Sequence, residues 1–170
     1  MLTYREAKKE LFGYFYTNWQ NGLANGLPNS SPPISPITFT DNLDGTGETY
    51  SPIVLYRNIE LSYKIQAGRH FARITMHNLH SPQRSLPGGR QNGGAVKFTT
   101  EGIGIVQLFF SKSTYSTAEE DFLVAIASEM FVGKSSSNIW FRNVTIKDKP
   151  PEEKHFRTDV DFQYRYDTHV

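Results

Sequence analysis

The most regular pattern in the chain lies at residues 101–146, EGIGIVQLFFSKSTYSTAEEDFLVAIASEMFVGKSSSNIWFRNVTI. An almost continuous apolar run from Ile103 to Phe110 is typical of a central strand that is covered on at least one face. The period then changes to that of a helix, for which Thr117 and Glu120 form a predicted capping box. Gly133 predicts the stop of this helix, and the aromatic segment 138–146 predicts another strand.

The end of the chain alternates between two kinds of side chain. One face of the predicted last strand carries Phe156, Thr158, Val160, Phe162, Tyr164 and Tyr166. The other face carries Arg157, Asp159, Asp161, Gln163, Arg165 and Asp167. This alternation predicts a strand with one core face and one solvated face, or a face that meets another polar surface. We therefore expect folding to tolerate a double change of Asp159 and Asp161 to Lys.

The first half of the chain begins with an amphipathic helix. Thr3 and Glu6 form a predicted capping box, and apolar residues then recur every four positions before Gly22, at Ala7, Leu11, Phe15 and Trp19. Trp19 and Trp140 are both interpreted as core aromatics. Gly, Pro, Asn and Ser crowd residues 21–36, which predicts a long surface connection. A short strand is predicted at 37–40, and the alternation in 69–80 predicts a strand buried mainly on one face.

These elements predict one α+β domain over residues 1–170, in which a mainly antiparallel mixed sheet is packed by two helices. Two segments stand apart from this pattern. Residues 41–66 are interpreted as an insertion, and residues 81–94, SPQRSLPGGRQNGG, are expected to form a mobile loop because they offer little apolar surface to offset the entropy of ordering.

Composition sets limits on the partners and the compartment. The chain has 170 residues with 18 Lys plus Arg against 17 Asp plus Glu, so its net charge of +1 gives no global attraction to nucleic acid or to an anionic membrane. It contains no cysteine, which excludes disulfides and thiolate metal sites and suits synthesis in a reducing cytosol. No apolar run approaches the length of a membrane span, and the charged N-terminus does not resemble a signal peptide.

Two groups of residues were weighed as enzyme or metal sites. His70, His77 and His80 cluster in the sequence, but His70 and His77 differ by an odd number and point to opposite faces of a strand, so we predict no metal site. Asp148, Glu152 and Lys154 match a fragment found in metal-dependent nucleases. Here the pair Glu152 and Lys154 follows two prolines in a predicted turn, and a solvated hairpin is the preferred interpretation, with a nuclease as the enzyme alternative.

No other motif points to a reaction. The glycines of 101–105 and 87–94 match neither the Walker nor the dinucleotide-binding pattern, and no nucleophile elbow is present. We therefore predict a protein that is not an enzyme and that carries no cofactor. Arg84, Arg90 and Lys97 are interpreted as a candidate partner-contacting group, with ordinary solubilising charge as the alternative.

The arrangement nevertheless resembles a known family. A strand like EGIGIVQLFFSK, a helix like STAEEDFLVAIASEMF, a strand like NIWFRNVTI and a last strand containing FQYRYD are similar to the C-terminal half of phage tail terminator, or tail completion, proteins related in fold to those of lambda-type phages. The leading helix YREAKKELFGYFYTNW fits the family's first helix. The likeness covers residues 4–19 and 69–166 and rests on a pattern of elements.

The resemblance implies a structural virion protein. Family members form a ring, usually a hexamer, at the head-proximal end of the tail tube, end its polymerisation and join it to the head connector. It implies contacts with a second copy, the tail tube protein and the head–tail connector, and DNA passing through the channel without sequence-specific binding. Arg157, Asp159, Asp161, Arg165 and Asp167 then become a candidate assembly or channel face. Another head–tail connector or a tail-tube protein is the alternative.

Overall fold

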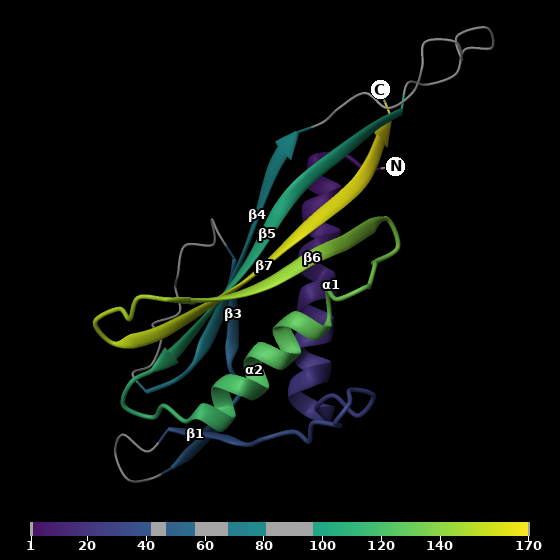
Figure 1. The fold of residues 1–170 in the computed structure, drawn as a ribbon. Helices are drawn as coiled ribbons and strands as arrows, with labels where there is room; N and C mark the ends of the chain where they lie inside the picture. Colours follow the sequence, from purple (N-terminus) through teal and green to yellow (C-terminus); the bar gives the residue numbers. More distant parts are fainter. Residues whose placement is uncertain (1, 42–46, 57–67, 81–96, 170) are drawn as a thin grey trace, which may run out of the picture.

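The computed structural model describes residues 2–41, 47–56, 68–80 and 97–169. In chain order its elements are α1 (Tyr4–Asn25), β1 (Phe39–Asp41), β2 (Glu48–Tyr50), β3 (Ile53–Tyr56), β4 (Phe71–His80), β5 (Lys97–Ser111), α2 (Thr117–Glu129), β6 (Ile139–Lys149) and β7 (His155–His169). Five strands form one sheet in the order β3-β4-β5-β7-β6, and β1 pairs with β2 separately (Figure 1). The predicted α+β class is confirmed.

The five-stranded sheet is mixed but mainly antiparallel. β5 lies at its centre, as its apolar run predicted, and pairs antiparallel with β4 and β7. The longest pairing joins β5 to β7, from Lys97 opposite His169 to Ser111 opposite His155. β6 also pairs antiparallel with β7 and forms one edge of the sheet. β3 forms the other edge and runs parallel to β4, a pairing that its sequence did not indicate.

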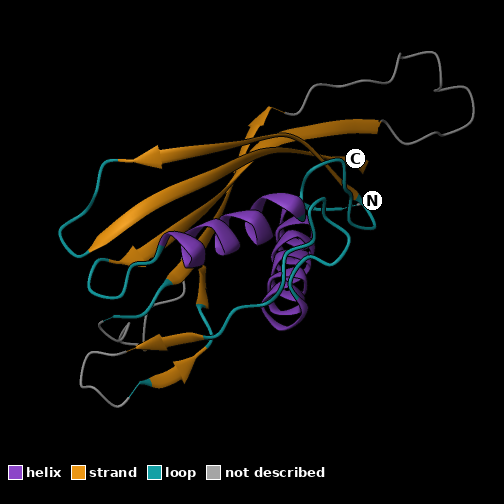
Figure 2. Ribbon diagram, turned by 60° about the horizontal axis from the view of Figure 1, so that its bottom comes forward, coloured by secondary structure: helices purple, strands orange, loops and turns teal. Residues whose placement is uncertain are grey.

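Both helices pack on the same side of this sheet (Figure 2). α1 has the predicted capping box, in which the Thr3 side chain accepts from the Glu6 amide and the Glu6 carboxylate accepts from the Thr3 amide. The helix passes through Gly22 and ends at Asn25. Gly22 is needed inside the helix because an added Cβ would lie 2.7 Å from the side chain of Ile126 on α2.

The start of α2 differs from the predicted capping box. Its N-cap is Ser116, one residue earlier than predicted, and no side chain caps it. Glu119 instead reaches His70 at 3.0 Å. Glu120 accepts hydrogen bonds from Tyr115 and Thr158. The acidic side chains of the first turn therefore tie the helix to the sheet, a role that local spacing does not reveal.

Two glycines of β5 allow aromatic rings to lie flat on the strand. Gly102 is paired with Tyr164 and Gly104 with Phe162, both on β7. A Cβ on either glycine would overlap the ring of its partner. Phe162 and Tyr164 are buried on the helix-covered side of the sheet. The glycines that match no nucleotide-binding motif thus have a packing role.

Several sequence predictions change here. Trp19 is buried and its indole N–H donates to the carbonyl of Pro52 at 3.0 Å, but Trp140 is 43% exposed, so its assignment to the core was wrong. Within 41–66, β2 pairs with β1 and β3 joins the main sheet, so part of the predicted insertion belongs to the sheets. The predicted mobile loop 81–94, with Arg84 and Arg90, lies outside the described residues. Lys97 is the first residue of β5.

Candidate functional site on the helix-free face of the sheet

The side of the five-stranded sheet that faces away from α1 and α2 carries the charged residues predicted on the last strand. We call it the helix-free face. On β7 it presents Arg157, Asp159, Asp161, Gln163, Arg165 and Asp167, at alternate positions to the core residues. The register of β6 places Lys149, Lys147, Thr145, Arg142 and Trp140 beside them. The predicted residues therefore share a face, spread in a row along β7.

Asp159 is the point at which this face departs from the prediction. The residue is only 3% exposed, although it was expected on a solvated surface. Its carboxylate accepts two hydrogen bonds from the Arg157 guanidinium, at 2.8 and 2.9 Å, and lies 3.8 Å from Lys149. Hydrogen bonding to Asp159 raises the pKa of Arg157. The two charges are tightly coupled because burial removes most of the water from the Asp159 carboxylate, which leaves Arg157 as its main partner.

The burial of Asp159 changes the expected response of this face to charge reversal. A Lys at position 159 would place a second cation against Arg157 and Lys149 in a site with little water. Burying like charges together is strongly unfavourable. The double change of Asp159 and Asp161 to Lys is therefore expected to destabilise the fold as well as any assembly.

Further along β7, the ion pairs reach across strands and are more exposed. Asp161 lies 2.7 Å from the Lys147 ammonium, and this hydrogen bond raises the Lys147 pKa. Arg142 lies 3.3 Å from Glu101 on β5. These cross-strand pairs neutralise opposite charges within one subunit. They are consistent with the register of β5, β6 and β7 on this face and add modestly to it.

At the end of the row, Arg165 meets an aromatic partner. Its guanidinium lies 5.5 Å from the ring centre of Trp140 on β6, in a cation–π arrangement. Asp167 accepts a hydrogen bond from Thr99 at 3.0 Å. The contact with Arg165 orients Trp140 on the helix-free face while leaving nearly half of the side chain exposed.

The opposite end of the helix-free face is apolar. Leu55, Phe71 and Phe109 form a small buried cluster, with the two rings stacked 4.5 Å apart. The guanidinium groups of Arg73 and Arg157 lie 5.4 and 5.8 Å from the centre of Phe109. Sequence reasoning missed this cluster. The odd-numbered positions of Phe71 and Phe109 were an available signal, since they place both rings opposite the core residues of their strands.

His155 borders that cluster. Its ring lies edge-on to Phe71, with centroids 5.4 Å apart. Burial lowers the pKa of His155 below its usual value of 6.5, although Glu152 acts in the opposite direction. The neutral imidazole is therefore the favoured form against these rings.

The edge strand β6 carries two large apolar side chains that are exposed. Trp140 is 43% and Ile146 is 52% exposed. Between them, the pairing with β7 shifts at a bulge that contains Asn143 at a φ of 53°. Bulges and charged side chains are common devices that limit uncontrolled pairing at sheet edges. Sequence reasoning missed this edge because the position of β6 in the sheet order depends on long-range pairing.

The residues considered for metal chemistry do not converge. His70 and His77 lie on opposite faces, as predicted, with His70 buried and bound to Glu119 and to the Ser111 amide. Asp148 accepts from Thr158 on the helix-covered side, whereas Glu152 lies 3.6 Å from Arg157. Within the part of the chain that the structure describes, no group of three or more His, Cys, Asp or Glu residues is placed to hold a metal ion.

Two comparisons with known proteins found no match. No family model matches the chain, and none of the curated proteins matches it. Among the described residues, neither helix has the length and apolar character needed to cross a membrane.

Proposed function

We propose that this protein is a structural component of a phage virion that forms a ring, of six copies in the preferred form, at the head-proximal end of the tail tube. The ring ends tube polymerisation and joins the tail to the head connector, while DNA passes through its channel. The protein is assembled in the host cytoplasm and resides at the head–tail junction. The proposal begins from the resemblance of residues 4–19 and 69–166 to tail terminators.

The observation that carries the assembly part of the proposal is edge strand β6. Trp140 and Ile146 expose large apolar surfaces on a strand at the end of the sheet order. The outer edge of β6 pairs with residues 134–136 near Trp140, and beyond that contact it has no neighbour among the described strands. Aromatic side chains are enriched at the centres of protein interfaces. A ring requires a heterologous contact, in which one surface of a subunit meets a different surface of the next. We assign β6 to one side of that contact and a second copy of the chain as its occupant.

The ion pairs of the helix-free face favour assembly over lining the channel with free acidic groups. Asp159 and Asp161 are each paired with a cation of their own subunit. A carboxylate paired in this way exerts little net field on a passing phosphate. The ion pairs of this face connect β6 to the rest of the sheet, and this rigidity supports the proposed role of β6 in assembly.

Electron microscopy of tail tubes tests the function directly. Purified protein added to isolated tubes is expected to cap one end of each tube with a ring, and deletion of the gene is expected to give overlong tails without a cap. Loss of tails altogether would instead identify a tube subunit. Tubes that remain bare at saturating protein would contradict the terminator role.

A further inference from the structure

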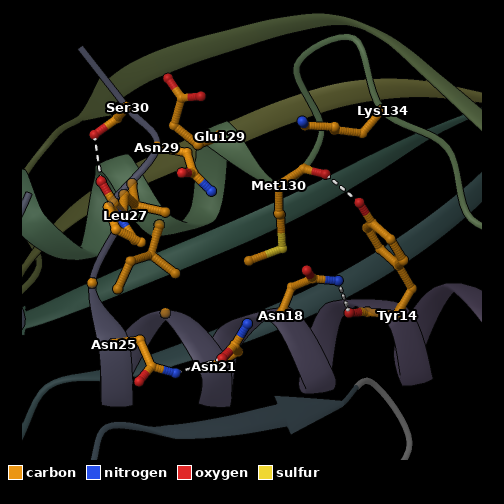
Figure 3. Close-up of a pocket in the computed structure, with 14 residues that line it drawn as sticks. Tyr14, Asn18, Asn21, Asn25, Leu27, Asn29, Ser30, Glu129, Met130 and Lys134 are labelled. Carbon is orange, nitrogen blue, oxygen red and sulfur yellow. Dashed lines mark hydrogen bonds between the residues drawn. The ribbon is translucent and has the colours of Figure 1, made fainter. Parts of the chain in front are cut away.

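A pocket of about 600 Å³ lies where the C-terminal ends of the two helices meet. One wall is the C-terminal half of α1, from Tyr14 to Asn25, another is the end of α2, and the loop at 26–30 closes a third side (Figure 3). The loop is braced by two backbone hydrogen bonds between Leu27 and Ile34. None of the residues on the helix-free face takes part in it, so the pocket is a separate site.

The floor of the pocket is closed and rigid. Ile126 and Met130 of α2 lie beneath it at 1% and 7% exposure, and Gly22 lets α1 approach Ile126 closely. The apolar surface that stays open to a ligand belongs to the partly exposed Tyr14 and Leu27. The Tyr14 hydroxyl donates to the Met130 carbonyl at 2.6 Å and fixes the end of α2 to α1 (Figure 3). A ligand that entered would meet a preformed surface and would not have to order it.

The α1 wall consists of a row of asparagine side chains. Asn18, Asn21 and Asn25 lie at i, i+3 and i+7, which places them on one side of the helix, and all three line the pocket (Figure 3). Asparagine is a poor helix former, whereas Ala, Lys or Glu would stabilise an exposed helical stripe. Three asparagines in two turns therefore lower helix stability at a position where the fold does not demand them.

The row presents both kinds of hydrogen-bonding group. The Asn18 amide nitrogen donates to the Tyr14 carbonyl, which leaves the Asn18 side-chain oxygen as an acceptor. The Asn25 amide nitrogen donates to the Asn21 side-chain oxygen at 2.6 Å. This bond leaves the Asn25 oxygen as an acceptor and the Asn21 NH₂ group as a donor. Acceptor, donor and acceptor thus follow one another along the helix.

This spacing suits a peptide main chain. From Asn18 to Asn25 the helix rises about 10 Å. An extended peptide covers about the same length with three residues, and its N–H and C=O groups alternate along its edge. Neutral donors and acceptors of one row can therefore bind backbone groups of either kind without selecting particular side chains.

The electrostatics of the pocket favour a cation. The C-terminal ends of α1 and α2 both lie at the pocket, and neither helix has a basic residue in its last turn. Helix C-termini carry partial negative charge, which a cation stabilises. Glu129 and Lys134 on the rim cancel each other in formal charge. At each helix end one carbonyl already accepts a hydrogen bond, Gly22 from the Gly26 amide and Met130 from the Tyr14 hydroxyl. The partial negative charge of the two helix ends is then what distinguishes ligands of opposite charge.

We propose that this pocket binds an extended peptide segment that carries a basic side chain, held through its main chain by Asn18, Asn21 and Asn25. The exposed apolar surface of Tyr14 and Leu27 receives the aliphatic part of the basic side chain, and the charge of that side chain lies toward the two helix ends. The site does not depend on ring assembly, because every group that forms it belongs to one subunit.

The test uses NMR titration of the ¹⁵N-labelled, full-length protein. The probes are mixtures of acetylated and amidated pentapeptides with a fixed central Lys, Ala or Glu, together with maltotriose. The Lys mixture is expected to shift the side-chain amide signals of Asn21 and Asn25 in a saturable way. Binding of the Glu mixture is expected to be about fivefold weaker, because its charge opposes both helix ends.

The variants separate recognition from folding. A double change of Asn21→Ala and Asn25→Ala should weaken binding about tenfold through the loss of its hydrogen bonds. The same change should leave the melting temperature unchanged or raise it, because Ala is the better helix former. Gln20→Ala, an exposed position on the same helix that does not line the pocket, is the matched control and should bind normally.

Three results would overturn the proposal. One is the absence of saturable shifts with any peptide mixture at millimolar concentration. Another is unchanged binding in the Asn21→Ala/Asn25→Ala variant, or binding of the Glu mixture as tight as that of the Lys mixture. The third is saturable binding of maltotriose alone, which would identify a carbohydrate site. A ring that fails to form leaves all of these readouts intact, so the two proposals fail separately.

Discussion

On the helix-covered face of the sheet, the ring of Phe162 stacks on Phe131 with centroids 3.8 Å apart. Three positions earlier along β7, the helix-free face buries the carboxylate of Asp159 against the Arg157 guanidinium. Both side chains are almost fully buried, at 0% and 3% exposure. The first is stabilised by the burial of apolar surface, whereas the second is tolerated only because its charge is paired.

This difference in what stabilises the two buried side chains predicts how each face of the sheet responds to substitution. A truncated apolar side chain leaves a cavity, whose cost grows with the volume that its neighbours fail to fill. A truncated charged side chain leaves its partner without compensation, so the cost depends on how far water can reach that partner. Arg157 keeps a quarter of its side chain exposed, so water can solvate it in part.

Phe162→Ala should have the largest effect on stability. The ring packs on Phe131 and covers Gly104, and neither neighbour can move to fill the space without disturbing the core. We expect the free energy of unfolding to fall by about 3–5 kcal/mol. Urea denaturation followed by circular dichroism measures this loss.

The control for this change is Phe156→Ala on the same strand. Phe156 is 37% exposed and lies beyond the centre of the core, so its loss should cost well under half as much. Equal losses at positions 156 and 162 would show that the helix-covered face does not carry the core.

Asp159→Ala should have an intermediate effect. It removes both hydrogen bonds to Arg157 and leaves that guanidinium partly buried without its partner. We expect a loss of about 1–3 kcal/mol in the free energy of unfolding. The same denaturation measurement applies.

Asp161→Ala provides the comparison within the helix-free face. Its partner Lys147 has a side chain that is 53% exposed, and exposed ion pairs contribute less than about 1 kcal/mol. The account of this face would be wrong if Asp161→Ala destabilised the protein as much as Asp159→Ala, because burial would then not decide the cost.

The smallest effect should come from the titration of His155. Its folded-state pKa lies below the usual 6.5, so the unfolded chain takes up a proton first as the pH falls. The contribution of His155 to stability is present above pH 6.5 and is lost as the pH falls from there through the lower folded-state pKa. His155→Phe keeps an aromatic ring beside Phe71 and removes this titration.

Denaturation between pH 7 and pH 5 measures the effect as the difference between the wild type and His155→Phe. The wild type should lose stability relative to the variant over this interval. Parallel curves for the two proteins would contradict the assigned burial of His155, since an ordinary histidine pKa gives no linkage.

The sequence predicted those parts of the fold that depend on local periodicity. The spacing of Ala7, Leu11, Phe15 and Trp19 identified the buried side of α1, and the alternation in 155–167 separated the two faces of β7. Each pattern recurs several times along a single helix or strand, and every recurrence indicates the same buried side. The α+β class follows from the order of such elements.

The sequence predictions that failed concern residues whose surroundings are formed by segments far away in the sequence. Trp140 has the composition of a core residue but lies on an edge strand, and only the order of β7 and β6 shows this. Asp159 is buried because β6 and the Arg157 side chain cover it. Gly102 and Gly104 on β5 leave the space that the rings of their partners on β7 occupy. Registers of this kind are set by tertiary packing, which single-strand patterns do not encode.

In the candidate site, too, some features follow from local periodicity and others only from tertiary packing. The charged row from Arg157 to Asp167 was identified from alternation alone, whereas its neighbours Lys147, Lys149 and Arg142 required the pairing of β6 with β7. The asparagine row of α1 was visible in the sequence at 18, 21 and 25. Its meaning depends on α2 and the loop at 26–30, which complete the pocket.

The claim that β6 joins subunits into a ring is tested most directly by electron microscopy of tail tubes mixed with a double variant, Trp140→Thr and Ile146→Thr. Threonine keeps the strand preference, and both sites are exposed, so the melting temperature should stay near that of the wild type. We predict that the variant leaves tube ends bare, whereas the wild type and Val132→Thr, a change at an equally exposed site outside β6, cap them with rings. Normal caps on tubes mixed with the double variant would contradict the account.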